Sequence, residues 1–319
     1  MLNRTPFLII LSVLFLASCG ERPIVQTSET ITATDSDSLS NLPTGADIEA
    51  MLHEHVAILA SDEFEGRAPA TAGEEKTISY LMEQFEALGI APGNNGSYFQ
   101  SVDVTEITTS NNPVLQIQGN SYEASFNYGE QMMAGTQHQI PAISVQDSEM
   151  VFVGYGIVAP ERNWNDYEGI NVTDKTVVIL VNDPGYATQD PSLFNGNAMT
   201  YYGRWTYKYE EAARQGAAAA LIVHETGPAG YGWEVVSNSW SGPQIGLTSS
   251  NLNDDLTDIE GWLTLDSAEA LFAGADLNYQ ELKTAAAQPG FTAVEMSDLK
   301  VSVSIENAVR TSTSQNVIA

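Results

Sequence analysis

The chain has 319 residues, of which 43% are hydrophobic and 9% aromatic, so it is long and apolar enough for about two folded domains and is not wholly disordered. It contains 41 acidic residues against 12 Lys and Arg, which gives a formal net charge of −29. The basic residues are scattered and form no patch in the sequence, which excludes nucleic acid as a partner.

The first 18 residues have the pattern of a secretory signal peptide. One charge, Arg4, precedes an apolar run over residues 7–17, which is shorter than the roughly 20 residues that a membrane span needs. Leu16-Ala17-Ser18-Cys19 resembles the bacterial lipobox, and Cys19 is the only cysteine. We therefore expect cleavage before Cys19, lipidation of Cys19, and an exported lipoprotein anchored in a membrane, at the outer membrane or facing the periplasm. The alternative is an ordinary signal peptide with an incidental Cys19.

Residues 19–45 are rich in Ser and Thr and poor in apolar side chains, which predicts a disordered tether. A helix is predicted over residues 46–60 because apolar side chains recur there at helical spacing: Ile48, Leu52, Val56 and Leu59. The Thr71-x-x-Glu74 capping pattern and Gly89 mark the two ends of a second helix. Residues 99–109 then predict a strand.

Beyond residue 110 the pattern changes to short strands and turns. We expect a hairpin over residues 115–126, buried strands at 151–158 and 176–181, a helix at 204–215, strands at 217–223 and 262–265, a long loop at 227–242, and one or two helices within 266–288. Residues 299–305 alternate apolar and polar side chains, which predicts a strand with one solvated face that could pair with the 99–109 strand. That pairing would make residues 110–297 an insertion.

Four histidines, His53, His55, His138 and His224, limit the possible metal sites. His53 and His55 lie two positions apart on a predicted helix and project about 200° apart, so they cannot share one ion. His224 follows a predicted buried strand but has no evident partner, and His138 has the setting of a loop residue. The sequence contains no G-x-S-x-G elbow, no Walker A loop and no paired C-x-x-C motif.

Carboxylates and aromatic residues leave two kinds of site open. A pair of carboxylates could serve glycoside hydrolysis, but solvated surface acid is the simpler interpretation of the candidates Asp183, Glu210, Glu211 and Glu225. Aromatic residues crowd residues 201–209, and Trp233 and Trp240 follow on the next predicted loop. They could line a peptide or sugar cleft or close a small core. The candidate cleft-wall residues are Tyr201, Tyr202, Arg204, Trp205 and Trp233.

Three strings near the start of the folded part, Ala60-Ser-Asp-Glu-Phe-Glu-Gly-Arg67, Gly73-Glu-Glu-Lys-Thr77 and Leu88-Gly-Ile-Ala-Pro92, resemble the opening of bacterial zinc aminopeptidases of the M-twenty-eight family. Many relatives have glycine where this chain has Ala70. Several further segments resemble the protease-associated domain that is inserted in these enzymes: residues 165–167, 175–184, 198–205, 221–226 and 230–233. Residues 314–319 resemble the strand by which such chains re-enter the peptidase domain.

The resemblance implies an α/β fold in which an incomplete zinc-exopeptidase domain is interrupted by a β-rich α+β protease-associated domain. The implied divisions of the chain are a signal peptide at 1–18, a lipid-anchored tether at 19–45, the N-terminal part of the peptidase domain at 46–109, the protease-associated domain at 110–297 and the re-entry into the peptidase domain at 298–319.

The resemblance also implies a metallopeptidase that uses two zinc ions and acts on peptide substrates. In that family the zinc ligands and the general base follow the re-entry strand. We therefore expect the metal-binding part beyond Ala319, no catalytic or metal-ligating residue in this chain, and an N-terminal fragment that is inactive by itself. The alternative is a non-catalytic, lipid-anchored module that binds peptide or glycan.

Overall fold

The computed structural model describes residues 43–319, in two compact units that divide after Ala60. The predicted signal peptide, the lipidated Cys19 and most of the predicted tether lie outside the described residues. In the described part of the first unit, helix α2 (Gly45–Leu59) confirms the helix expected from the apolar spacing. Thr44 and Asp47 cap this helix reciprocally, because each accepts a hydrogen bond from the backbone N–H of the other.

The second unit opens with the short helix η1 (Asp62–Arg67) and with α3 (Ala72–Ala87). Thr71 accepts from the Glu74 N–H over 3.4 Å and Gly89 has a φ of 70°, so both predicted ends of α3 are confirmed. Ala70 has a φ of 57°, in the left-handed region. A residue with a Cβ pays about 1–2 kcal/mol there, which explains why glycine suits this turn.

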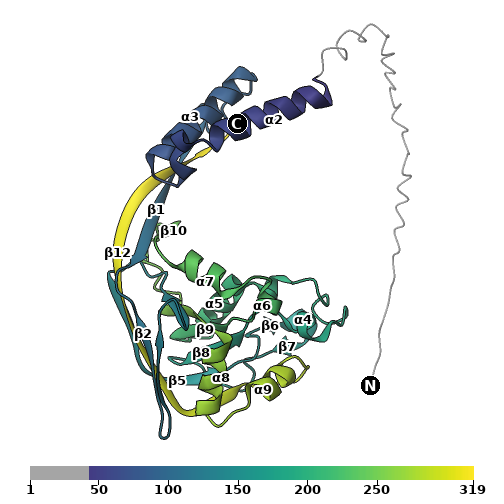
Figure 1. Ribbon diagram of the computed structural model, residues 1–319, viewed down its shortest axis with the longest axis vertical. Helices are drawn as coiled ribbons and strands as arrows, with labels where there is room; N and C mark the ends of the chain where they lie inside the picture. Colours follow the sequence, from purple (N-terminus) through teal and green to yellow (C-terminus); the bar gives the residue numbers. More distant parts are fainter. Residues whose placement is uncertain (1–42) are drawn as a thin grey trace, which may run out of the picture. The chain divides into compact units, whose positions relative to one another are not determined.

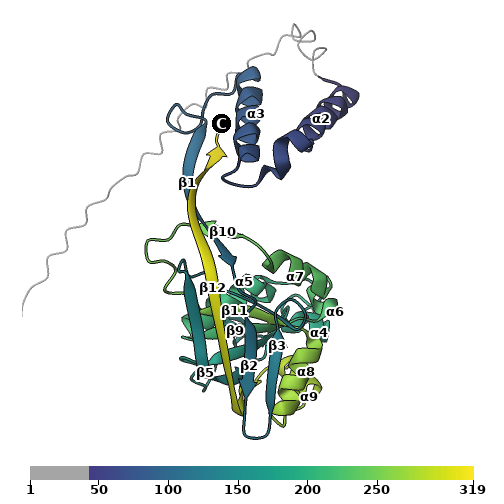
Figure 2. The same cartoon turned by 60° about the vertical axis from the view of Figure 1, so that its left-hand side comes forward.

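A ten-stranded sheet with the order β10-β1-β12-β5-β8-β9-β11-β4 organises the second unit, and the hairpin β2–β3 joins it at β12 (Figures 1 and 2). The strands are β1 (Phe99–Thr109), β2 (Val114–Gln118), β3 (Glu123–Asn127), β4 (Met132–Gly135), β5 (Ala142–Phe152), β8 (Thr176–Leu180), β9 (Ala219–Val223), β10 (Gln244–Leu247), β11 (Ile259–Leu263) and β12 (Val294–Val317), with β6 (Val158–Ala159) and β7 (Trp164–Asn165) forming a separate pair.

Strand β12 has 24 residues and is shared between two neighbours. Its first part, up to Glu306, pairs with β5, and its second part pairs with β1 over eleven positions, from Thr109↔Asn307 to Phe99↔Val317. The expectation that residues 299–305 pair with β1 is therefore wrong, because these residues lie on β5. The partner of β1 is the continuation of the same strand, where polar residues on both faces hide the alternation in the sequence.

Strands β5, β8, β9 and β11 run parallel, and the predicted strand–helix–strand unit is confirmed as β8–α5–β9. The helices of this region are η2 (Pro160–Arg162), α4 (Pro184–Thr188), η3 (Tyr201–Gly203), α5 (Trp205–Arg214), α6 (Thr226–Ala229), α7 (Trp233–Trp240), α8 (Leu265–Gly274) and α9 (Tyr279–Ala286). The fold of this unit is thus mixed α/β.

Alternate side chains of the parallel strands pack in two apolar clusters, one on each face of the sheet. Val177 and Ile179 of β8 pack in the cluster that contains Tyr209, whereas Val178 and Leu180 pack in the cluster that contains Phe272. Because both faces are covered, β8 is apolar after Thr176 and β9 is apolar throughout. This explains why they could be recognised as buried strands from the sequence.

Two predicted segments differ in the structure, and two short strands were not predicted. The strand expected over residues 151–158 ends at Phe152, because Gly154 and Gly156 have φ of 56° and 62° and turn the buried chain. The loop expected over residues 227–242 contains helices α6 and α7. Strands β4 and β10 were not expected, since each has only four residues.

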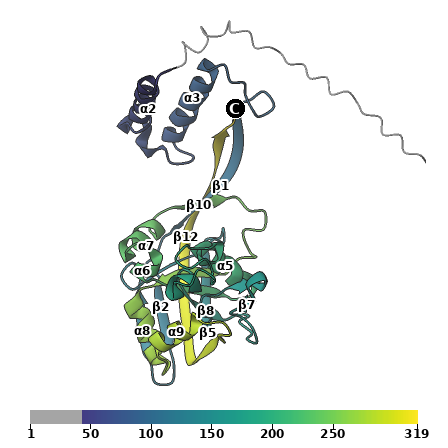
Figure 3. The same ribbon diagram turned by 90° about the vertical axis from the view of Figure 1, so that its right-hand side faces the viewer.

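The end of β12 lies beside α3 (Figure 3). Glu74 of α3 accepts hydrogen bonds from two residues of this end, Ser314 and Gln315. Its Oε1 accepts from Ser314 Oγ and, over 3.1 Å, from the Gln315 N–H, and its Oε2 accepts from the Ala70 N–H. Burial raises the pKa of Glu74, but the hydrogen bonds from Ser314, Gln315 and Ala70 outweigh it and hold the pKa below its usual 4.5.

Replacing Glu74→Ala should lower the free energy of unfolding by about 1–3 kcal/mol, because two backbone donors and one hydroxyl lose their acceptor. The neighbouring exposed Glu75 is the matched control, and Glu75→Ala should change it by less than about 0.5 kcal/mol. Urea unfolding measures both. The difference should be complete above pH 4.5 and shrink as the pH falls through the folded-state pKa of Glu74, since a protonated carboxyl accepts less well. Equal effects of the two substitutions would contradict this role.

Candidate functional site

The aromatic segment around helix α5 distributes its side chains between the core and the surface. Tyr207, Lys208 and Tyr209 are buried, whereas Trp205 at the first position of α5 is 41% exposed. Helix α5 follows the short helix η3 and lies between β8 and β9 in the chain. Its sequence therefore places one tryptophan at the surface above a buried aromatic layer.

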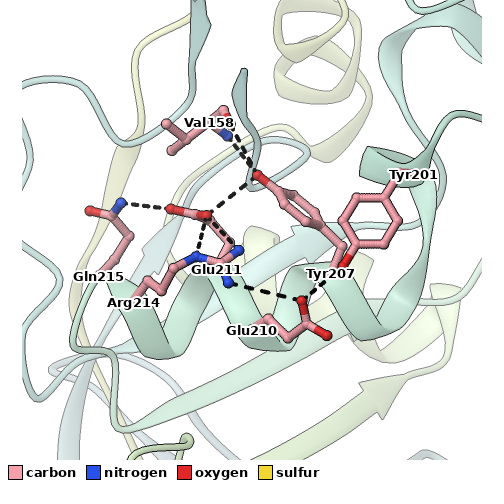
Figure 4. Close-up of polar contacts among 7 residues, drawn as sticks. All are labelled: Val158, Tyr201, Tyr207, Glu210, Glu211, Arg214 and Gln215. Atoms are coloured by element: carbon pink, nitrogen blue, oxygen red, sulfur yellow. Dashed lines mark hydrogen bonds and ion pairs between the residues drawn. The ribbon is translucent and has the colours of Figure 1, made fainter. Parts of the chain in front are cut away.

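A polar network fixes the outer side of α5 (Figure 4). Glu211 accepts from Arg214 Nε over 2.9 Å and from Gln215 Nε2 over 2.8 Å, and it also receives the Tyr207 hydroxyl over 3.4 Å. Tyr207 Oη in turn accepts from the Val158 N–H over 3.0 Å. The Glu211 carboxylate is 7% exposed and already engaged by three partners, so this candidate acid holds α5 in place.

Glu210, the neighbouring candidate acid, lies on the exposed side of the same helix. It accepts from the Tyr201 hydroxyl over 3.0 Å and lies 3.9 Å from Arg214 Nη1, with 44% of its side chain exposed. A solvated pair of this kind contributes little to stability. The solvated-surface interpretation of Glu210 thus agrees with its position, whereas Glu211 is buried.

A second polar group is buried beneath the same segment. Lys208 donates from Nζ to the Tyr155 carbonyl over 2.7 Å, and burial lowers its pKa to about 7 against the opposing effect of Asp166 and Asp183. Asp166 accepts from the Ile157 N–H and from Trp164 Nε1, and burial raises its pKa to about 7. Neither Lys208 nor Asp166 was singled out from the sequence, because an isolated charge in an aromatic segment is normally solvated.

A cavity of about 700 Å³ opens at the carboxyl ends of β8 and β9, where ligands of parallel sheets commonly bind. Two candidate acids lie on its wall. Asp183 caps α4 and accepts from the Thr200 N–H over 2.9 Å and from the Thr200 hydroxyl over 2.7 Å. Glu225 receives the Tyr279 hydroxyl over 2.8 Å and pairs with Lys283. Both carboxylates are therefore satisfied by the chain itself.

A groove of about 390 Å³ lies beside the start of α5, between it, the end of α7 and strands β1 and β10. Trp205 and Trp240 lie on its wall, and their rings form a triangle with the ring of the buried Tyr209, with centroids 5.9 to 6.1 Å apart. Tyr209 is anchored by its hydroxyl, which donates to the Gly261 carbonyl of β11 over 2.8 Å. Glu260, the preceding residue of β11, also lines the groove.

The five predicted cleft-wall residues do not share one site. Of these, Trp205 lines the groove. Tyr202 packs on Phe194 and donates to Glu161, Arg204 is exposed at the start of α5, and Tyr201 bonds Glu210. Trp233 donates from Nε1 to the Gly129 carbonyl over 2.8 Å and packs on His224. The structure adds Trp240 and Glu260 to Trp205 instead.

The histidines have structural partners. His224 Nε2 lies 3.1 Å from the Tyr231 carbonyl, and burial lowers the pKa of its ring. His138 Nε2 lies 3.1 Å from the Leu256 carbonyl, and His53 lies 3.9 Å from Glu49 on α2. Within residues 43–319 no group of three or more His, Cys, Asp or Glu side chains could hold a metal ion. No helix in the same range is long and apolar enough to cross a membrane.

No family model and no curated protein matches the chain. Among solved structures, the aminopeptidase from Aneurinibacillus sp. strain AM-1 is similar, with 18% identity and a TM-score of 0.36 over 78% of this chain and 42% of that chain. The chain thus spans less than half the length of that protein. At so low a TM-score the likeness does not transfer the activity of the aminopeptidase to this chain.

Glu211 and Glu210 provide a matched pair for testing the α5 network. Glu211→Ala should lower the free energy of unfolding by about 1–3 kcal/mol, because it removes a buried carboxylate that accepts hydrogen bonds from Arg214, Gln215 and the Tyr207 hydroxyl. Glu210→Ala should cost less than about 1 kcal/mol, since its partners are exposed. Denaturant unfolding of both variants checks this. If Glu210→Ala proved the more damaging, the network would not stabilise α5 as described.

Proposed function

We propose that this chain is the N-terminal portion of an exported, lipid-anchored zinc aminopeptidase that removes N-terminal residues from peptides. The observation that carries the proposal is a contact between two strings that resemble the M-twenty-eight family. Glu74, in the string Gly73–Thr77, accepts hydrogen bonds from Ser314 and Gln315, in the string at residues 314–319. The opening of the peptidase domain and its re-entry strand are expected to meet in this way.

The ladder between β1 and β12 supports the same proposal. It joins residues 99–109 to residues 307–317, so residues 110–306, which include the first part of β12, lie between the two paired stretches. This is the arrangement expected of an inserted protease-associated domain. The proposed division of the chain is therefore a peptidase part on both sides of one insertion.

Zinc is assigned to the full-length protein and to no residue of this chain. The described residues provide no group of three ligands, so they do not fit a zinc site of the kind the family uses. No step of peptide hydrolysis is therefore assigned to the side chains described above. The proposed contribution of the insertion is to form part of the substrate cleft, and Trp205 is the predicted wall residue that lies in an open groove.

A second candidate function is a non-catalytic, lipid-anchored module that binds peptide or glycan. The groove with Trp205, Trp240 and Glu260 favours it, because aromatic rings beside a carboxyl and several amides can hold a ligand without any reaction. The first function requires that the full-length protein hydrolyses peptides, whereas the second requires binding alone. They also differ in whether the reading frame continues after codon 319 into His, Asp and Glu ligands.

Aminopeptidase activity can be tested with chromogenic aminoacyl substrates in the presence of zinc. We expect no turnover by residues 19–319 and clear turnover by the product of the extended reading frame, which a chelator should abolish. Sequencing the DNA after codon 319 provides the independent check. Turnover by residues 19–319 that equals that of the longer product would refute the assignment, and a stop codon directly after codon 319 would favour the binding module.

A further inference from the structure

The groove beside α5 is built around a carboxyl that has no positive partner. Glu260 is 4% exposed, and its Oε1 accepts from Gln137 Nε2 over 2.7 Å. Among the ion pairs within residues 43–319 none involves Glu260, and the charge that acts on its pKa comes from another acid, Glu210. A buried carboxylate without a cation is costly, so the site is suited to a positively charged ligand.

The aromatic wall lies next to this carboxyl. Glu260 on β11 is paired with Gly135 on β4, and the Trp240 ring covers Gly135 at 3.5 Å from the position that a Cβ would occupy. The rings of Trp205 and Trp240 meet at 63°, with their centroids 6.1 Å apart. Two indole rings set at an angle beside a carboxyl form the kind of corner that attracts an ammonium or guanidinium group.

The remaining polar groups of the groove are uncharged. Amides and hydroxyls predominate among them, including those of Gln137, Gln244, Asn253 and Thr105. Such groups hydrogen-bond the N–H and C=O groups of a peptide. A glycan would also use amides and tryptophans, but it would leave the Glu260 charge without a counter-ion. The net charge of −29 further favours a cationic ligand over an anionic one.

We infer that this groove binds the cationic group of a peptide, an ammonium or guanidinium held between Trp205 and Trp240 and paired with Glu260. The group could be a Lys or Arg side chain or a free N-terminus, since these share the same chemistry. The inference does not rest on the proposed peptidase activity, because binding is measured without hydrolysis. If the peptidase proposal fails its test, binding of a cationic peptide can still be tested, and the reverse also holds.

The protonation of Glu260 gives binding a defined pH dependence. Burial raises its pKa to about 7, with the hydrogen bond from Gln137 opposing the shift and Glu210 adding to it. Strands β4 and β9 on either side contribute no titratable residue, and α5 contributes Tyr209 besides Glu210. A cation binds the charged form, so affinity should rise between pH 6 and pH 8.

The test uses capped tripeptides with a central Lys or a central norleucine, measured by calorimetry and by tryptophan fluorescence. The Lys peptide should bind at least tenfold more tightly than the neutral norleucine peptide. An uncapped norleucine peptide distinguishes a free N-terminus from a side chain, and an oligosaccharide of N-acetylglucosamine tests the glycan. Equal affinity for the capped Lys and norleucine peptides, preference for the oligosaccharide, or no binding of any probe would overturn the inference.

Two variants locate the site. Glu260→Gln keeps the side-chain shape and an acceptor for Gln137, and it should lower the affinity for the Lys peptide at least tenfold and remove the rise with pH. Glu210→Gln, which changes an exposed carboxylate on α5, is the matched control and should alter affinity less than twofold. Trp205→Leu, at a half-exposed ring, provides an independent test that spares the buried carboxyl. Unchanged affinity in both Glu260→Gln and Trp205→Leu, with unchanged melting temperature, would place the ligand elsewhere.

Discussion

The antiparallel ladder between β1 and β12 is the constraint on which the rest of the second unit depends. Its eleven pairs join residues that lie about two hundred positions apart in the chain, so everything between them must fold back to the same place. Closing so long a loop costs entropy that grows slowly with its length, and a continuous ladder of backbone hydrogen bonds offsets that cost. Glu74 strengthens the closure, because its carboxylate bonds Ser314 at a separation of 240 residues.

The continuity of β12 determines how the insertion is attached. A single strand of 24 residues pairs with β5 in its first part and with β1 in its second part, so no loop separates the two regions on that side. A hinge motion there would have to break ladder hydrogen bonds. The insertion is therefore joined to β1 by one stiff strand, and groups near the junction, such as those of β10 and the Trp205 groove, keep a fixed relation to β1.

The sequence could predict those elements whose signal is local and repeated. The stripe of α2, the ends of α3 at Thr71 and Gly89, and the apolar strands β8 and β9 all follow from the spacing of a few residues. Helix α7 was missed because the glycines and serines around it indicate a loop, whereas Val236 and Trp240 pack against the sheet. Tertiary packing decided that segment, and no local pattern reports it.

The candidate site could be predicted only in part, because tertiary packing also decides which residues meet there. Trp205 could be singled out because aromatic residues are dense around it, although Tyr202, Arg204 and Trp233 proved to lie elsewhere. The sequence did not indicate that Glu260 is buried, since one acidic residue inside a five-residue strand indicates an edge strand or a turn. Its burial becomes evident only when Gly135 pairs opposite it and Trp240 closes over that glycine.

The buried ionisable residues differ in whether the chain provides a partner of opposite charge. Lys208 and Asp166 act on each other, so each partly offsets the cost of burying the other. Glu260 has no such partner, and between pH 4.5 and about pH 7 the folded protein retains a proton there that the unfolded chain has released. Stability therefore falls as the pH rises through that window. A glutamine at this position would fill the same space and keep an acceptor for Gln137 without that cost, so packing alone does not explain a carboxyl at residue 260. A cationic ligand does, because it would supply the counter-ion that the chain lacks.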